Sequence, residues 1–139
     1  MEVTTRTARH DAAEKTAKWR LAYIDVAERD ARKFLDDDQY AHAVQLFDDL
    51  AHEDNPRLSE TQDVKPIDGF FELRDKGGIL RKINLRVYFA VLDDRHLILV
   101  LGADKKEDDG QTSSHIKTRI RNRMRLVLEI LNIDKKGAR

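Results

Sequence analysis

The chain has 139 residues, enough for one domain with a single hydrophobic core. It contains no cysteine, which excludes disulfides, thiolate zinc sites and cysteine nucleophiles. The formal net charge is zero, but residues 1–64 hold 9 Lys/Arg against 15 Asp/Glu, whereas residues 65–139 hold 17 against 11. The basic second half could follow phosphates, and the acidic first half could shield it or keep the protein soluble.

No segment has the composition of a membrane span or of a secretory signal. The stretch richest in apolar residues, 83–101, is repeatedly interrupted by charged side chains, and a membrane helix needs about 20 apolar residues. Residues 1–17 are polar and of mixed charge. We therefore expect a cytoplasmic protein without a membrane partner. The five histidines show no close ligand spacing, so we predict neither a metal site nor another cofactor.

The first elements are taken from periodicity. Residues 1–17 show no strong period and are expected to be a flexible or helical N-terminal extension. Trp19, Leu21 and Tyr23 alternate with smaller or charged residues, which predicts a strand. Two helices are predicted next, over about 26–36 and 39–54, where apolar residues recur at three-and-four spacing. The acidic turn between them predicts a helical hairpin.

Beyond residue 64 the period changes from helical to alternating. A short strand is predicted over 70–74, followed by a Gly-rich basic loop over 76–82. The strands at about 84–92 and 96–102 should pair as a hairpin through the Asp93-Asp94 turn. The two helices should pack on the face that bears Val87 and Phe89.

The last predicted element is a helix that begins after residues 112–114, with a basic outer side. The order of elements predicts one α+β domain over residues 18–131, in which a small twisted antiparallel β-sheet carries an N-terminal helical hairpin and a C-terminal helix. Residues 132–139 are expected to form a tail.

Cations gather around the predicted middle strands. Arg74 ends one strand, and Arg86 lies on the next strand, on the same face as Tyr88. The loops beside these strands add Lys76, Arg81, Lys82, Lys105 and Lys106. We expect Arg86 to lie outside the core, because it is on the strand face opposite Val87. In an antiparallel meander the cations would converge near one face of the sheet.

Such a cluster suits the cleavage of RNA by its neighbouring 2′-hydroxyl group. Arg and Lys can stabilise the charge that develops on the phosphorane, and a Lys, Tyr or His of shifted pKa can move the protons. Tyr88 and His115 are the candidates for proton transfer. The plainer interpretation is that the cations are a solvated surface, that Tyr88 is a packing residue, and that His115 is a surface residue.

Three segments resemble the RelE/HigB toxin superfamily. Residues 64–74 (VKPIDGFFELR) resemble its "hKPL-G-LYELR" segment, especially in the phage-derived, HigB-like branch. Residues 85–89 (LRVYF) are similar to its "YRVFY" strand, and Lys105-Lys106 stands where relatives commonly have a Lys pair. The resemblance extends over about residues 18–131. It implies a RelE-like fold and a basic active site to which Arg74 and Arg86 are the best matches.

The resemblance implies a toxin of a type II toxin–antitoxin system that acts as a ribosome-dependent mRNA endonuclease. Its expected partners are mRNA on the ribosome and an antitoxin, which we expect to be a small helix-turn-helix protein. The sequence departs from the family after the Lys pair, where the acidic run 107–109 replaces Thr and Pro. Two alternatives stay open: a non-catalytic RNA- or protein-binding module on the same fold, and an interaction protein unrelated to RNA.

Overall fold

Strands and helices succeed one another as expected of an α+β protein. The computed structural model describes residues 1–8, 17–107 and 110–131. The strands within this part are β1 (Val3–Thr7), β2 (Arg20–Ile24), β3 (Asp63–Pro66), β4 (Phe71–Asp75), β5 (Leu85–Leu92) and β6 (Leu97–Lys105). The helices are α1 (Asp25–Arg32), α2 (Asp37–Leu50) and α3 (Ser114–Ile130), with 3-10 turns at Pro56–Leu58, Gly78–Leu80 and Asp93–Arg95.

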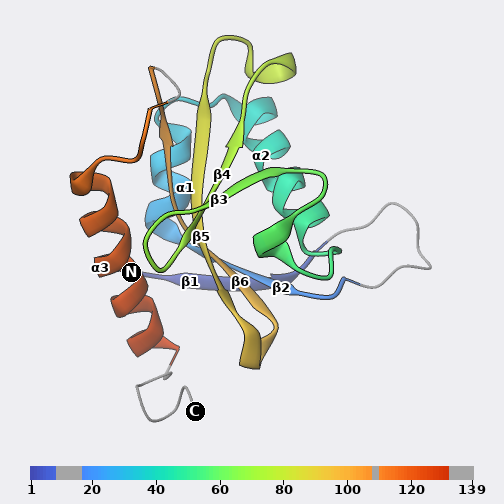
Figure 1. Ribbon diagram of the computed structural model, residues 1–139, viewed down its shortest axis with the longest axis vertical. Helices are drawn as coiled ribbons and strands as arrows, with labels where there is room; N and C mark the ends of the chain where they lie inside the picture. Colours follow the sequence, from blue (N-terminus) through green and yellow to red (C-terminus); the bar gives the residue numbers. More distant parts are fainter. Residues whose placement is uncertain (9–16, 108–109, 132–139) are drawn as a thin grey trace.

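The strands join in one six-stranded sheet of order β1-β2-β6-β5-β4-β3 (Figure 1). The predicted hairpin of β5 and β6 is confirmed, with an irregularity in register between Tyr88 and Phe89. The expectation of a wholly antiparallel sheet is wrong, because β2 and β6 pair in parallel. Parallel neighbours need a crossover connection, and here α1, α2 and three strands lie between them in the chain.

Two strands occur where the sequence did not predict them. β1 pairs with β2 along one edge of the sheet, so residues 3–7 are neither flexible nor helical. Three of the five β1 residues are threonines, whose branched side chains favour strands. β3 pairs with β4 along the other edge. The predictions for residues 9–16 and for the tail 132–139 fall outside the described residues.

Helices α1 and α2 pack on the sheet face that the sequence indicated. The Phe47 ring of α2 meets the Phe89 ring of β5 edge to face, with the ring centres 5.4 Å apart. α2 begins with a capping box, in which Asp36 accepts a hydrogen bond from the backbone of Gln39 at 2.8 Å and the Gln39 side chain accepts one in return. This box fixes the start of α2 directly after α1.

Helix α3 docks beside β6, apart from α2 (Figure 1). Ser113 caps it by accepting a hydrogen bond from the backbone of Ile116 at 3.2 Å. Gly102 of β6 lets the helix approach: a Cβ atom there would lie 2.7 Å from Ile120 Cδ1. Arg123 of α3 donates to the Leu101 carbonyl at 3.0 Å and to Asp30 of α1 at 2.6 Å, so α3 is tied to both the sheet and α1.

Among the described residues, no helix has both the length and the apolar character needed to cross a membrane.

Candidate functional site

A buried polar cluster lies on the sheet face opposite Val87 and Phe89. The register of β4 and β5 places Glu72 opposite Tyr88 and Arg74 opposite Arg86. One oxygen of the Glu72 carboxylate, Oε1, accepts hydrogen bonds from Arg74 Nε at 3.0 Å and from Arg86 Nη1. The other oxygen, Oε2, accepts one from the Thr112 hydroxyl at 2.6 Å. The carboxylate is therefore held from β4, from β5 and from the segment that leads into α3.

Arg86 lies inside this cluster and not on a free surface. Its side chain is 0% exposed, as is that of Glu72. The expectation that Arg86 lies outside the core is wrong, because the segment around Thr112 closes over the second face of β5. A buried guanidinium needs a partner for its charge, and Glu72 supplies it. In this arrangement Arg86 cannot touch a phosphate in solvent without displacement of the chain above it.

Tyr88 is buried in the same layer. It is 1% exposed, and its ring meets Phe70 edge to face with the ring centres 6.0 Å apart. Its hydroxyl has no hydrogen-bond partner among the described residues. Burial raises the pKa of Tyr88, and the negative charges of Glu72 and Asp104 raise it further. Tyr88 therefore stays protonated near neutral pH and does not reach solvent.

The open part of the site is a surface hollow of about 450 Å³ at the β3–β4 edge. It is lined by Asp63, Lys65, Arg74, Asp75, Lys76 and Asn84. Arg74 connects the two layers: its side chain is 19% exposed and also bonds Glu72, which fixes the direction of the guanidinium. The structure thus brings Arg74 and Lys76 together, as predicted, and adds Lys65 from the neighbouring strand.

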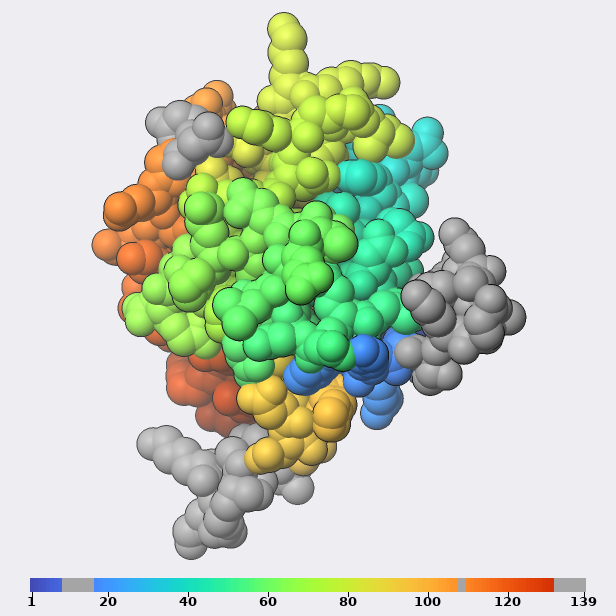
Figure 2. Space-filling model, turned by 45° about the vertical axis from the view of Figure 1, so that its right-hand side comes forward, coloured from blue at the N-terminus to red at the C-terminus, as the bar shows by residue number. Residues whose placement is uncertain are grey.

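The remaining predicted cations surround the hollow. Arg81 and Lys82 are exposed in the loop before β5, and Lys105 is exposed at the end of β6. Lys106 is half-buried: its backbone N–H donates to the carbonyl of Asn84 at 3.0 Å, and its Nζ donates to the carbonyl of Gln111 at 3.3 Å. In the space-filling view, β3, β4, the 76–82 loop and the chain leading into α3 form one continuous surface (Figure 2).

His115 does not join the cluster. It is exposed on the first turn of α3 and does not line the hollow. Sequence reasoning also missed a histidine with a partner: His42 Nε2 of α2 lies 2.7 Å from Asp75 Oδ2 at the end of β4. The two residues are 33 positions apart, so no local spacing could indicate the pair. It joins α2 to the strand that carries Arg74.

The arrangement suits phosphate binding better than proton transfer. A half-exposed guanidinium held in a fixed direction can donate two parallel hydrogen bonds to a phosphate, and nearby lysines add positive charge. Asp63 and Asp75 offset part of that charge. Of the two predicted proton-transfer residues, Tyr88 is buried and His115 lies apart. The geometry therefore assigns binding to Arg74 and its neighbours and identifies no general base.

Comparisons with known proteins agree with the motifs of the sequence. A search of the curated proteins found no match. Among solved structures, the chain is similar to one in "The crystal structure of the toxin-antitoxin complex RelBE2" from Mycobacterium tuberculosis, with 20% identity, a TM-score of 0.44, and coverage of 70% of this chain and 100% of that chain. The family model described as "Phage derived protein Gp49-like (DUF891)" matches residues 33–125, about two thirds of the sequence. The chain therefore belongs to the phage-derived Gp49-like family, which confirms the resemblance of its motifs to the phage-derived branch.

Proposed function

We propose that this protein is the toxin of a toxin–antitoxin system and that it cuts mRNA on the ribosome. The observation that carries the proposal is the hollow at the β3–β4 edge, where Arg74 is aimed by Glu72 and flanked by Lys65 and Lys76. The RNA phosphate would lie against Arg74, which can stabilise the charge that develops during attack of the 2′-hydroxyl.

The buried cluster then has a supporting role. Glu72 holds Arg74, and Arg86 neutralises Glu72 from below. The proton acceptor and donor would come from the RNA, the ribosome or residues brought in on binding. An antitoxin partner of the helix-turn-helix type remains part of the proposal, because it follows from the family resemblance.

The first test is growth arrest on induced expression of the protein alone. Arg74→Ala and Lys76→Ala should each relieve the arrest, because each removes a cation from the hollow. The matched control is Arg95→Ala, which removes an exposed cation from the turn at the far end of the β5–β6 hairpin. Melting temperatures must accompany the test, since Arg74 also bonds Glu72. Arrest that persists in both folded hollow variants would contradict the proposal.

A second candidate function is RNA binding without cleavage on the same surface. The burial of Tyr88 and Arg86 specifically favours it, because these residues cannot reach a phosphate as the chain is folded. Such a protein would retard RNA on a gel and leave it intact. Its affinity would fall with salt in proportion to the number of phosphates contacted, at about 0.7 logarithmic units per contact for a single strand.

A further inference from the structure

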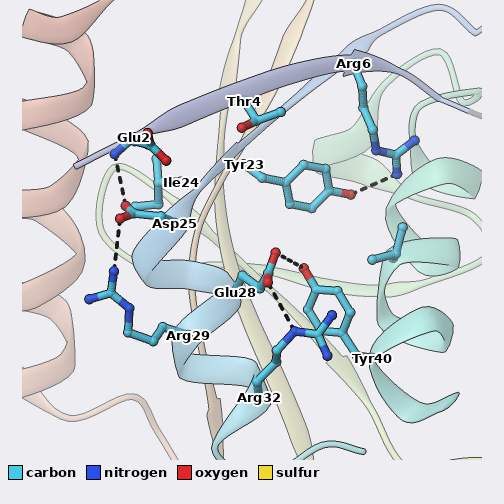
Figure 3. Close-up of a pocket in the computed structure, with 11 residues that line it drawn as sticks. Glu2, Thr4, Arg6, Tyr23, Ile24, Asp25, Glu28, Arg29, Arg32 and Tyr40 are labelled. Carbon is cyan, nitrogen blue, oxygen red and sulfur yellow. Dashed lines mark hydrogen bonds and ion pairs between the residues drawn. The ribbon is translucent and has the colours of Figure 1, made fainter. Parts of the chain in front are cut away.

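A second pocket, of about 570 Å³, lies at the opposite edge of the sheet from the hollow. It is formed where β1 and β2 meet α1 and α2 (Figure 3). Its volume falls in the range of about 300–1,000 Å³ that is usual for ligand pockets. Because it lies at the β1–β2 edge, a ligand in this pocket leaves the hollow at the β3–β4 edge free.

Two tyrosine rings form the walls of this pocket, and each already holds a guanidinium. The Cζ atom of Arg6 is 5.3 Å from the ring centre of Tyr23, and that of Arg32 is 4.2 Å from the ring centre of Tyr40. Both distances fall within the reach of about 6 Å at which a cation is attracted to an aromatic face. The ring faces in this pocket therefore suit cationic groups.

Glu28 lies between the two rings in Figure 3. Its Oε2 accepts a hydrogen bond from Arg32 Nε at 3.1 Å, whereas its Oε1 has only a long contact of 3.4 Å with the Tyr40 hydroxyl. Burial, and then the negative charge of Glu28, raise the pKa of Tyr40 to about 12. Glu28 thus keeps capacity to accept a stronger donor.

The surroundings of the pocket are acidic. Residues 25–50 hold eight Asp/Glu and three Lys/Arg, and α2 has four aspartates with no Lys or Arg. Such a surface repels phosphates and attracts cations. Nucleic acid is therefore a poor occupant, and a basic polypeptide segment is a good one.

A small apolar chamber of about 30 Å³ opens behind the pocket and shares Tyr23, Glu28 and Tyr40 with it. Its other walls are mainly small or apolar side chains such as Ala27, Ala43 and Phe47. A chamber of this size accepts little more than a methyl group, which an aliphatic side chain could supply. Apolar contact beside a charged contact is typical of the centre of a protein interface.

We propose that this pocket docks a basic segment of a protein partner, whose Arg or Lys lies against Tyr23 and Tyr40 and pairs with Glu28 while an adjacent aliphatic side chain covers the apolar chamber. The inference concerns a different edge of the sheet from the RNA surface and does not depend on RNA cleavage. A partner held here could be present while RNA occupies the hollow.

The test uses the full ¹⁵N-labelled chain and three probes: an acetylated, amidated Leu-Arg-Leu-Arg peptide, the matching Leu-Glu-Leu-Glu peptide, and adenosine monophosphate. The Arg peptide should shift the amide signals of Glu28 and Tyr40 in a saturable manner. The Glu peptide and the nucleotide should not. Equal shifts with the Glu peptide, preferential binding of the nucleotide, or no shifts at millimolar Arg peptide would each overturn the proposal.

A pair of isosteric variants separates the pocket from general attraction to an acidic surface. Glu28→Gln should weaken the Arg peptide about fivefold, which is the upper range for loss of one exposed ion pair. Asp38→Asn makes the same change of charge at an exposed position of α2 that does not line the pocket and should leave the affinity nearly unchanged. Equal weakening by the two variants would mean that the pocket itself does not bind the peptide.

Discussion

At the scale of single residues, the main feature is the pair of Glu72 and Arg86, both fully buried in the sheet. Neither charge is tolerable alone in such surroundings, so each residue requires the other. Thr112 and Arg74 complete the hydrogen bonds of the carboxylate. The pair thereby connects the interior of the protein to the one arginine of the cluster that reaches the hollow.

Arg86→Ala should destabilise the protein by about 3–5 kcal/mol, because it leaves the Glu72 charge buried with a partner missing. The free energy of unfolding in urea measures this cost. The double variant Glu72→Leu/Arg86→Met should recover much of the loss, since it removes both charges and keeps the volume. An Arg86→Ala protein as stable as the parent would show that the pair is not buried in solution.

The sequence predicted part of this cluster correctly. Strand alternation placed Arg86 and Tyr88 on one face and Val87 on the other. It could not indicate that the first face is also covered, because the covering contact comes from Thr112, which is 40 residues from Glu72. A strand with both faces buried carries polar residues only where distant partners exist, and those partners are invisible to local periodicity.

All three tyrosines have a pKa raised above the ordinary value of 10.0, with burial as the first cause. The unfolded chain loses these protons near pH 10, whereas the folded chain keeps them to higher pH. Stability should therefore be unaffected by the tyrosines below pH 10 and should fall as pH rises toward 12. Urea midpoints across this range measure the effect, and Tyr88→Phe should reduce it. A midpoint that rises between pH 10 and 12 would contradict the assignment.

At the scale of elements, Asp30 determines how α3 is held. Its carboxylate accepts hydrogen bonds from Arg123 of α3 at 2.6 Å and from the backbone of Ala103 at 3.3 Å, at the end of β6 that β2 leaves unpaired. One carboxylate thus joins α1, β6 and α3. Because α3 follows directly on Thr112, its docking also keeps the Glu72 cluster covered.

Asp30→Ala should cost about 2 kcal/mol, the range for hydrogen bonds to charged groups. Amide hydrogen exchange should show the loss chiefly in α3, which would open before the sheet does. The control is Arg29→Ala on the same helix, which removes only an exposed pair with Asp25 and should cost less than about 0.5 kcal/mol. Equal effects of the two variants would mean that Asp30 does not anchor α3.

The sequence predicted the central elements better than the edges. α2, β5 and β6 have strong periods and recognisable turns, and each lies close to its predicted place. β1 and β3 were missed because edge strands carry polar residues, and β3 even ends in Pro66, which suits an edge that lacks a further partner. The parallel pairing of β2 with β6 could not be predicted either, since it joins strands more than 70 residues apart.

At the scale of the whole molecule, charge and topology divide the surface in the same way. The acidic half of the chain builds the β1–β2 edge with α1 and α2, and the basic half builds the hollow and its surrounding cations. The first edge is the one we assign to a protein partner, and the second the one we assign to RNA. Two ligands of opposite charge can therefore approach the protein from different directions.

The most direct test of the account is the mapping of mRNA ends in a purified translation system. The parent protein should cut a defined mRNA only when ribosomes are present, and Arg74→Ala should lower the cleavage rate about a hundredfold, as expected for loss of one preorganised charge contact. Arg95→Ala should cut at the parental rate. A folded Arg74→Ala protein that cuts as fast as the parent, or a parent protein that leaves the mRNA intact, would contradict the assignment of the hollow as the site of RNA cleavage.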